Sequence, residues 1–147
     1  LVDVSNTAIS SDGAYYVLFG WYGTDKQNLF FYDVKSTSLL WRKEYKLPTI
    51  KTIKIAPHDN FILVASYDLY SRFPHNMEFL LLDTKGNVKW KKQIKGSYFF
   101  NTGNIDYASF VDNGKEFKIF NGAAKKYHFF AIGKDGRVSE IGIVHEP

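Results

Sequence analysis

Hydrophobic and polar residues alternate along the chain in short runs separated by turn residues. The segment LLLDTKGNVKW, from Leu80 to Trp90, is typical: an apolar run, a turn from Asp to Gly, then a second short run. Runs of this kind, bounded by Gly, Asn and Asp, indicate β-strands joined by hairpins. No window of about eleven residues or more shows the 3.6-residue period of an amphipathic helix. The pattern therefore predicts an all-β chain with close to no helix.

The pattern predicts four strands in each third of the chain. We expect them at residues 6–10, 15–22, 28–34 and 39–45, then 50–57, 61–70, 77–84 and 88–94, then 105–111, 116–123, 127–133 and 137–144. Gly recurs at one position of the connecting turns SSDG, DTKG and GKDG, where a positive φ is needed. We therefore interpret Gly13, Gly86 and Gly136 as requirements of the backbone.

The order of segments recurs with a period of 50 residues. Asp33, Asp83 and Gly133 follow the equivalent apolar segments LFFYDV, FLLLDT and FFAIGK at this spacing. Four-stranded antiparallel units of this length are typical of β-propeller blades. We predict one domain over residues 1–147 with three four-stranded antiparallel blades, the first strand of each innermost, at about residues 5–46, 49–96 and 104–145.

Two longer motifs resemble a known repeat. ISSDGAYYVLFG followed by LFFYDVKSTSLLW, and again LLLDTKGNVKW, resemble the WD40-like and PQQ-like (quinoprotein-type) β-propeller repeats, and the resemblance covers essentially the whole chain. In the quinoprotein repeat a Trp docks between neighbouring blades, which implies that role for Trp41 and Trp90. The third repeat has Glu140 at that place, and the first has Ser36 and Thr37 where Thr-Gly would stand. The resemblance implies an architecture rather than a reaction, because such repeats serve enzymes, scaffolds and sensors.

Three blades are fewer than the about four to eight of a closed propeller, whose closure protects the strand edges. We expect a part of a longer propeller, or two copies joined into one ring, or extra segments that cover the edges. The chain begins with Leu1 rather than Met, which favours the first of these expectations.

Composition and charge narrow the classes of function. The chain has 147 residues, 18% of them aromatic, no Cys and a net charge of +4. The absence of Cys excludes disulfides and thiolate chemistry and leaves the compartment open. No apolar run approaches the roughly 20 residues of a membrane helix, so we expect a soluble chain. The basic segments WRKEYK and WKKQIK fall on outer strands, where Lys protects an edge, so a nucleic acid partner is not favoured.

No segment carries a catalytic, metal-binding or cofactor-binding motif. No two of the four histidines stand at the spacing of a metal site: His58, His75, His128 and His145. The acidic residues that recur in one turn of each repeat are interpreted as turn formers: Asp12, Asp59 and Asp112. We therefore expect no catalytic residue, metal or cofactor, and we interpret His58 as a turn residue.

Two loops stand out on the face where propellers usually bind, which is formed by the loops after the second and fourth strands. SRFPHN and the long KGSYFFNTGN are rich in aromatic and amide side chains. The candidate ligand or partner contacts are Arg72, His75, Tyr98, Phe99, Phe100, Asn101 and Asn104. The alternative is that the aromatic residues continue a strand or plug the central channel.

These features favour a non-catalytic binding or scaffolding module that displays loops to a protein or an extended ligand. The alternative is a blade segment of a quinoprotein-like or hydrolytic propeller enzyme whose catalytic residues lie elsewhere. An enzyme segment would place several polar side chains at the inner ends of the first strands. Lys51, Lys54 and Asp106 are positioned to reach the channel there, but they form no catalytic set. We expect a protein partner, with self-association or further blades as additional contacts.

Overall fold

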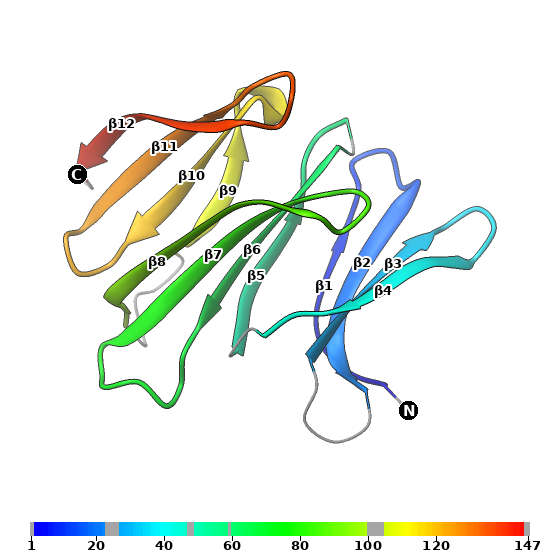
Figure 1. Ribbon diagram of the computed structural model, residues 1–147, viewed down its shortest axis with the longest axis horizontal. Helices are drawn as coiled ribbons and strands as arrows, with labels where there is room; N and C mark the ends of the chain where they lie inside the picture. The colour runs from blue at the N-terminus through cyan, green and yellow to red at the C-terminus, as the bar shows by residue number, and fades with distance from the viewer. Residues whose placement is uncertain (1, 23–26, 47–48, 59, 100–104, 146–147) are drawn as a thin grey trace.

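The computed structural model describes residues 2–22, 27–46, 49–58, 60–99 and 105–145, and it is all-β (Figure 1). Twelve strands form three four-stranded antiparallel sheets, each in chain order. The first sheet contains β1 (Val2–Ile9), β2 (Tyr15–Tyr22), β3 (Gln27–Asp33) and β4 (Ser38–Glu44). The second contains β5 (Thr49–Ile55), β6 (Phe61–Tyr67), β7 (His75–Asp83) and β8 (Val88–Tyr98). The third contains β9 (Ala108–Val111), β10 (Glu116–Asn121), β11 (Lys126–Ile132) and β12 (Val138–His145).

The three sheets are arranged as consecutive β-propeller blades. Their first strands lie next to one another, β1 beside β5 and β5 beside β9, whereas β4, β8 and β12 form the outer edges (Figure 1). The predicted fold class and the position of the first strand are confirmed. In the described part of the chain the only helical element is the short 3₁₀ turn η1 (Asp112–Gly114), and no helix there is long and apolar enough to cross a membrane.

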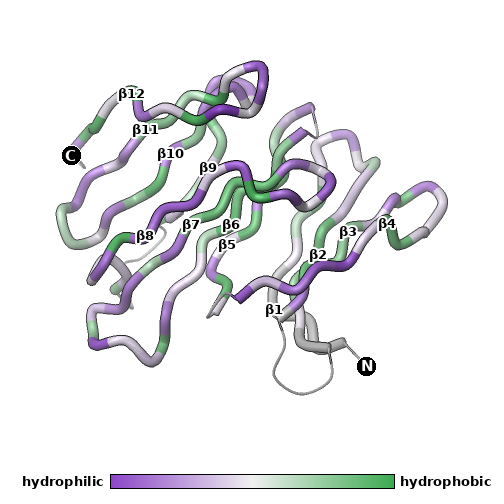
Figure 2. The backbone as a smooth tube through the Cα atoms, in the orientation of Figure 1, coloured by the Kyte–Doolittle hydropathy of each residue, from purple (hydrophilic) through white to green (hydrophobic). Residues whose placement is uncertain are grey.

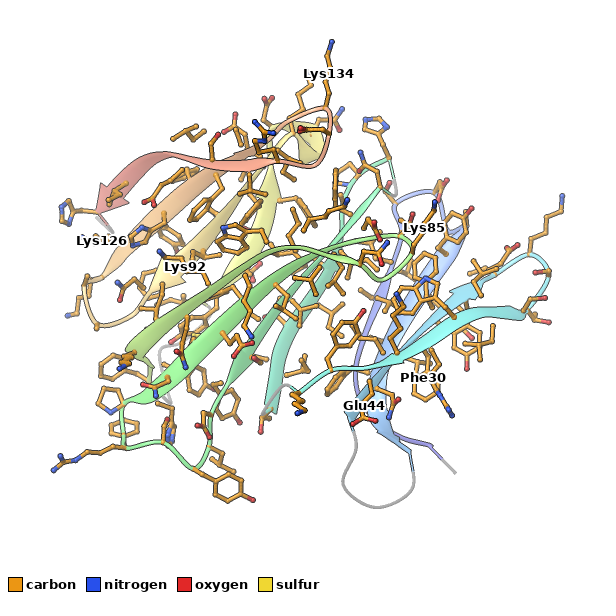
Figure 3. All side chains as sticks on the ribbon, in the orientation of Figure 1. Phe30, Glu44, Lys85, Lys92, Lys126 and Lys134 are labelled. Carbon is orange, nitrogen blue, oxygen red and sulfur yellow. The ribbon has the colours of Figure 1, made fainter. Side chains whose placement is uncertain are left out.

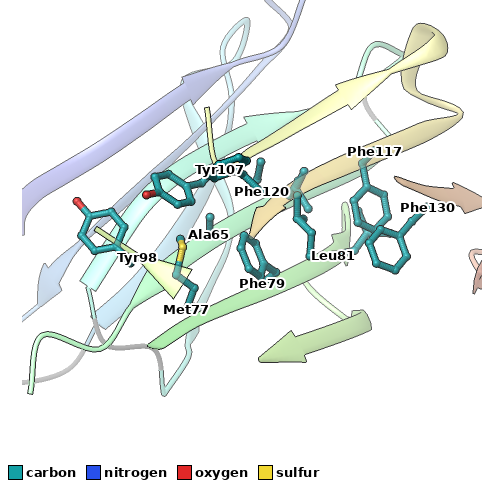
Figure 4. Packing of buried hydrophobic residues seen from close by; sticks show 12 residues of the cluster. Ala65, Met77, Phe79, Leu81, Tyr98, Tyr107, Phe117, Phe120 and Phe130 are labelled. Atoms are coloured by element: carbon teal, nitrogen blue, oxygen red, sulfur yellow. The ribbon is translucent and has the colours of Figure 1, made fainter. Parts of the chain in front are cut away.

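The second sheet is buried on both faces. Successive residues of β6 alternate between two hydrophobic clusters: Ile62 and Val64 face the first sheet, and Leu63 and Ala65 face the third. This explains why β6 is a continuous apolar run, as expected for a strand that is covered on both sides. Figure 2 shows hydrophobic residues concentrated on the middle strands of the sheets, such as β6 and β7, and Figure 4 shows the side chains packed between the second and third sheets.

Both tryptophans of the predicted docking position contact the next sheet. The Trp41 Nε1–H donates a hydrogen bond to the carbonyl oxygen of Thr84 at 2.6 Å. The Trp90 ring lies 5.0 Å from the ring of Phe117 and 4.8 Å from that of Phe130. Both rings are covered over most of their surface and keep only an intermediate exposure, because they lie on outer strands, where the seam between sheets meets solvent.

The third sheet has a serine, not Glu140, at the docking position. Trp90 lies opposite Leu81, and Ala131, the equivalent of Leu81, lies opposite Ser139. The expectation for Glu140 was wrong because the pairing of the last two strands shifts register at different places. The shift follows Leu81 in the second sheet, and in the third sheet it follows Phe129, two positions earlier in the repeat. The Glu140 Oε1 instead lies 2.9 Å from the Nδ1 of His128 on the neighbouring strand, within hydrogen-bond distance.

The turn between β7 and β8 has the backbone that its sequence predicts, and it also contacts the first sheet. Gly86 has a φ of 82°, and the Asp83 carboxylate accepts hydrogen bonds from the backbone N–H groups of Lys85 and Asn87. Burial opposes ionisation of Asp83, but these bonds hold its pKa below the usual value. Tyr45 directly follows β4, and its hydroxyl donates to the Gly86 carbonyl at 2.6 Å, so the turn is fixed to the first sheet.

Candidate binding site

The candidate site lies where the loop between β6 and β7 meets the end of β8. β6 ends at Tyr67, although the pattern predicted a strand to residue 70, because Asp68 starts a turn in which its carboxylate accepts from the Tyr70 N–H. β8 continues to Tyr98, past its predicted end at residue 94. The loop is therefore longer than expected, and the end of β8 runs beside its base. We call residues 68–74 the docking loop.

Hydrogen bonds hold the docking loop in one shape. The Ser71 hydroxyl donates to the Asp68 carbonyl at 2.7 Å and accepts from the Asn76 N–H at 2.9 Å. The His75 Nδ1 lies 2.9 Å from the Ser71 carbonyl, and the Asp68 N–H donates to the Asn76 carbonyl across the base of the loop. Such bonds reduce the ordering entropy that the loop would lose on binding.

Aromatic rings connect the docking loop to the strands below it. Tyr67 stacks on Tyr98 at 4.2 Å, and Tyr98 lies 5.3 Å from Tyr107, whose position beside it is seen in Figure 4. Phe73 contacts the ring edges of both His75, at 5.6 Å, and Phe99, at 5.9 Å. The rings form one continuous cluster, so the loop rests on a rigid base.

The predicted contacts differ in how accessible they are. Arg72 is exposed and Phe99 is half-buried, but His75 and Tyr98 are 7% and 6% exposed. For Tyr98 the alternative interpretation holds, because this residue continues a strand and packs inward. Three candidates lie outside the described residues: Phe100, Asn101 and Asn104.

Three large exposed side chains of the loop were not among the predicted contacts. Tyr70 is 95% exposed, Phe73 57% and Leu69 48%. Leu69 and Tyr70 were assigned to the preceding strand, where apolar residues are ordinary. The signal that would have found them is the Asp68 before them, a residue that favours turns over strands.

The charges on this face are mainly basic. The Asp68 carboxylate accepts a hydrogen bond within the loop, and Arg72 is the loop's exposed cation. The Lys51 ammonium lies 5.8 Å from the centre of the Tyr98 ring, within the range of a cation–π contact. Burial is the main reason that the pKa values of Tyr67 and Tyr98 lie above the usual one.

Two of the three polar residues expected near the channel pair with each other. The Lys54 ammonium lies 3.1 Å from the Asp106 carboxylate and joins the inner edges of the second and third sheets. Both side chains are partly exposed, so the pair contributes little to stability. Across the described ranges, no three His, Asp or Glu side chains are grouped so as to hold a metal ion.

No family model matches the chain, and no curated protein is significantly similar to it in sequence. Solved structures do share its fold. They include the WD40 domain of Toxoplasma gondii coronin, with TM-score 0.63, 11% identity, and coverage of 99% of this chain and 35% of that chain. Hydrazine synthase of Kuenenia stuttgartiensis matches with TM-score 0.62 and 14% identity, over 95% of this chain and 49% of that chain. Acylaminoacyl peptidase of Pyrococcus horikoshii matches with TM-score 0.55 and 15% identity, over 95% of this chain and 25% of that chain.

These likenesses define the class of the protein as a β-propeller fold. At 11 to 15% identity they support the fold alone. The chain spans half or less of the length of the solved chains that it matches.

Proposed function

We propose that the protein is a non-catalytic binding or scaffolding module, built from WD40-like or PQQ-like propeller repeats, that holds a protein partner on the docking loop. The observation that carries this proposal is the exposure of Leu69, Tyr70 and Phe73 on a loop fixed by hydrogen bonds. Large apolar side chains gathered on a folded surface mark interaction sites.

The composition of the loop suits a protein partner. Tyr and Arg are among the residue types most enriched in the energetic centres of interfaces, and the docking loop presents Tyr70 and Arg72 two positions apart. Phe99, at the end of β8, extends the apolar area beside Phe73. The partner therefore offers an apolar pocket for the aromatic side chains.

Charge defines the partner further. Arg72 is exposed, and Lys51 lies over the base of the same face. A partner whose pocket is rimmed by Asp or Glu would complement these cations. Association should then weaken as salt rises, because salt screens charges that are exposed to solvent.

Site-specific photo-crosslinking in the source cell tests the proposal. A photoreactive amino acid replaces Phe73 in one variant and Leu39, which is 49% exposed on the first sheet, in a matched control. We expect a protein adduct at position 73 that position 39 does not form. The same adducts at both positions, or none at position 73, would count against the proposal.

A second candidate function is a propeller segment of an enzyme. It is favoured by the acylaminoacyl peptidase structure, of which a chain of this length covers 25%. In that case residues outside this chain supply the catalysis, and the crosslinks from position 73 would fall within the same polypeptide rather than on another protein.

A further inference from the structure

A cavity opens between the second and third sheets at the end opposite the docking loop. It has a volume of about 580 Å³, within the range of about 300–1,000 Å³ that small-molecule sites occupy. Three connections surround it: the turn after β5, the turn after β9 and the turn after β11 (Figure 1). The first of these contributes His58, and the second contributes Asn113 and Gly114.

The walls of the cavity are held against each other across the two sheets. The Asn113 Nδ2 lies 2.9 Å from the His58 Nε2, so a hydrogen bond joins the two turns. A Cβ added to Gly114 would lie 3.0 Å from the Pro57 carbonyl oxygen, which shows how closely the backbones approach. The cavity is therefore preformed rather than a gap between independent loops.

Two residues at the cavity have a left-handed backbone. His58 has a φ of 74° and Asn113 a φ of 55°. Asn and His enter this left-handed region more often than most residues with a Cβ, although Gly enters it without steric cost. The equivalent turn of the first sheet uses no His: the Asp12 carboxylate closes it by accepting from the Ser10 hydroxyl and the Ala14 N–H. The turn can therefore form without a His at this place. We infer that the His58 side chain serves the cavity rather than the turn.

The lining combines an apolar floor with basic and amide groups. Phe61 and Ile132 contribute apolar surface, and Asn60, Lys115 and Lys134 contribute polar side chains. In the described residues, no carboxylate lies within ion-pair distance of either lysine, and the nearby Asp135 pairs with Arg137. Figure 3 shows Lys134 extending from the turn after β11 toward solvent, as a cation at a rim would.

From this arrangement we propose that the cavity binds a small organic anion with an apolar body, such as an aromatic carboxylate. The apolar part of the ligand packs on Phe61 and Ile132. The Lys115 ammonium binds the carboxylate, together with the hydrogen-bonded side chains of His58 and Asn113. This site is independent of the docking loop, which lies at the other end of the strands.

Nuclear magnetic resonance titration with benzoate as the probe tests the site, with the neutral benzamide as its isostere. We expect benzoate to shift the amide signals of Gly114 and Gly133 with a Kd of about 1–10 mM, the range for so small a ligand. Benzamide should bind at least about fivefold more weakly, because it lacks the charge. No saturable shift with benzoate, or equal shifts with both probes, would overturn the proposal.

Three variants locate the binding. Lys115→Met should weaken benzoate binding about fivefold or more, because it removes the charge-assisted bond, whereas Lys85→Met, on the turn after β7, should leave it unchanged. His58→Gly should weaken binding too, while the unfolding midpoint changes little, because relief of the left-handed backbone offsets the lost hydrogen bond to Asn113. An equal effect of Lys85→Met, or unchanged binding in His58→Gly, would contradict the assignment.

Discussion

At the scale of the residue, one indole ring covers the outer end of the hydrophobic cluster between the second and third sheets. Trp90 lies on an outer strand yet contacts Phe117 and Phe130 of the next sheet, which gives it the packing of a core residue on one side. The resemblance to propeller repeats implied this role, and the contacts agree with it. The third sheet has Ser139 at the equivalent place, so its outward face has no such ring.

Replacing Trp90 by Ala should therefore lower the free energy of unfolding. We expect a loss of about 3 kcal/mol, the lower end of the range for emptying a large aromatic site, because the ring keeps an intermediate exposure. Denaturant unfolding measures it. The control is Tyr70→Ala, which should change the value by about 0.5 kcal/mol or less, since Tyr70 is 95% exposed. Equal losses in the two variants would refute the docking role.

A second residue-scale prediction concerns Tyr45. Burial, with a smaller effect from the charge of Asp83, raises the pKa of its hydroxyl to about 12 from 10.0. As the pH rises, the hydroxyl of Tyr45 loses its proton in the unfolded chain before it does so in the folded protein. The contribution of Tyr45 to the free energy of unfolding is therefore fully present below pH 10 and is lost as the pH rises toward 12. Tyr45→Phe should cost about 1 kcal/mol at neutral pH, because the hydrogen bond to Gly86 is lost.

The alkaline behaviour of Tyr45→Phe separates this role from simple packing. Denaturant unfolding at several pH values should show the difference between the variant and the natural protein shrinking from pH 10 to pH 12. A difference that stays constant across this window would show that ionisation of Tyr45 is not linked to folding.

At the scale of the element, the hairpin turns differ in what surrounds them. Gly13 and Gly86 have similar φ values, 75° and 82°, but a Cβ on Gly13 would meet nothing within 4 Å. A Cβ on Gly86 would lie 2.9 Å from the Lys43 Cδ and 3.0 Å from the Tyr45 hydroxyl. The turn after β7 is therefore part of a seam, whereas the turn after β1 is not.

Alanine substitutions at these two glycines should separate backbone strain from seam packing. Gly13→Ala should cost about 1 kcal/mol, from the left-handed conformation alone. Gly86→Ala should cost about 2–3 kcal/mol, because overpacking adds to the strain. Thermal unfolding of both variants gives the comparison, and similar midpoints would mean that the seam contact adds nothing.

The strands were easier to predict from the sequence than the loops and the cavity. The spacing of Asp33, Asp83 and Gly133 was sufficient for the sheets and their order, because turn chemistry and strand period are local properties. The docking loop was placed only in part, since the apolar Leu69 suits a strand as well as an exposed loop. The cavity beside His58 was not predicted at all, because it depends on turns that are far apart in the chain.

At the scale of the whole molecule, the middle sheet is covered on both faces and the outer two are not. The first sheet exposes Ile9 and Leu39, and the third exposes Ile141 and Val144. Apolar residues on these faces are what further contacts of the propeller type would cover. The docking loop belongs to the covered middle sheet, so it is presented by the most completely packed part of the described structure.

The binding of a protein partner through the docking loop is the central claim. The most direct test is calorimetric titration of the partner found by crosslinking, using the natural protein, Tyr70→Ala and the control Leu39→Ala. We predict that Tyr70→Ala weakens binding by about tenfold or more, the effect of an interface hot spot, with an unchanged unfolding midpoint. Leu39→Ala should bind as the natural protein does. Unchanged affinity in Tyr70→Ala, or an equal loss in Leu39→Ala, would contradict the claim.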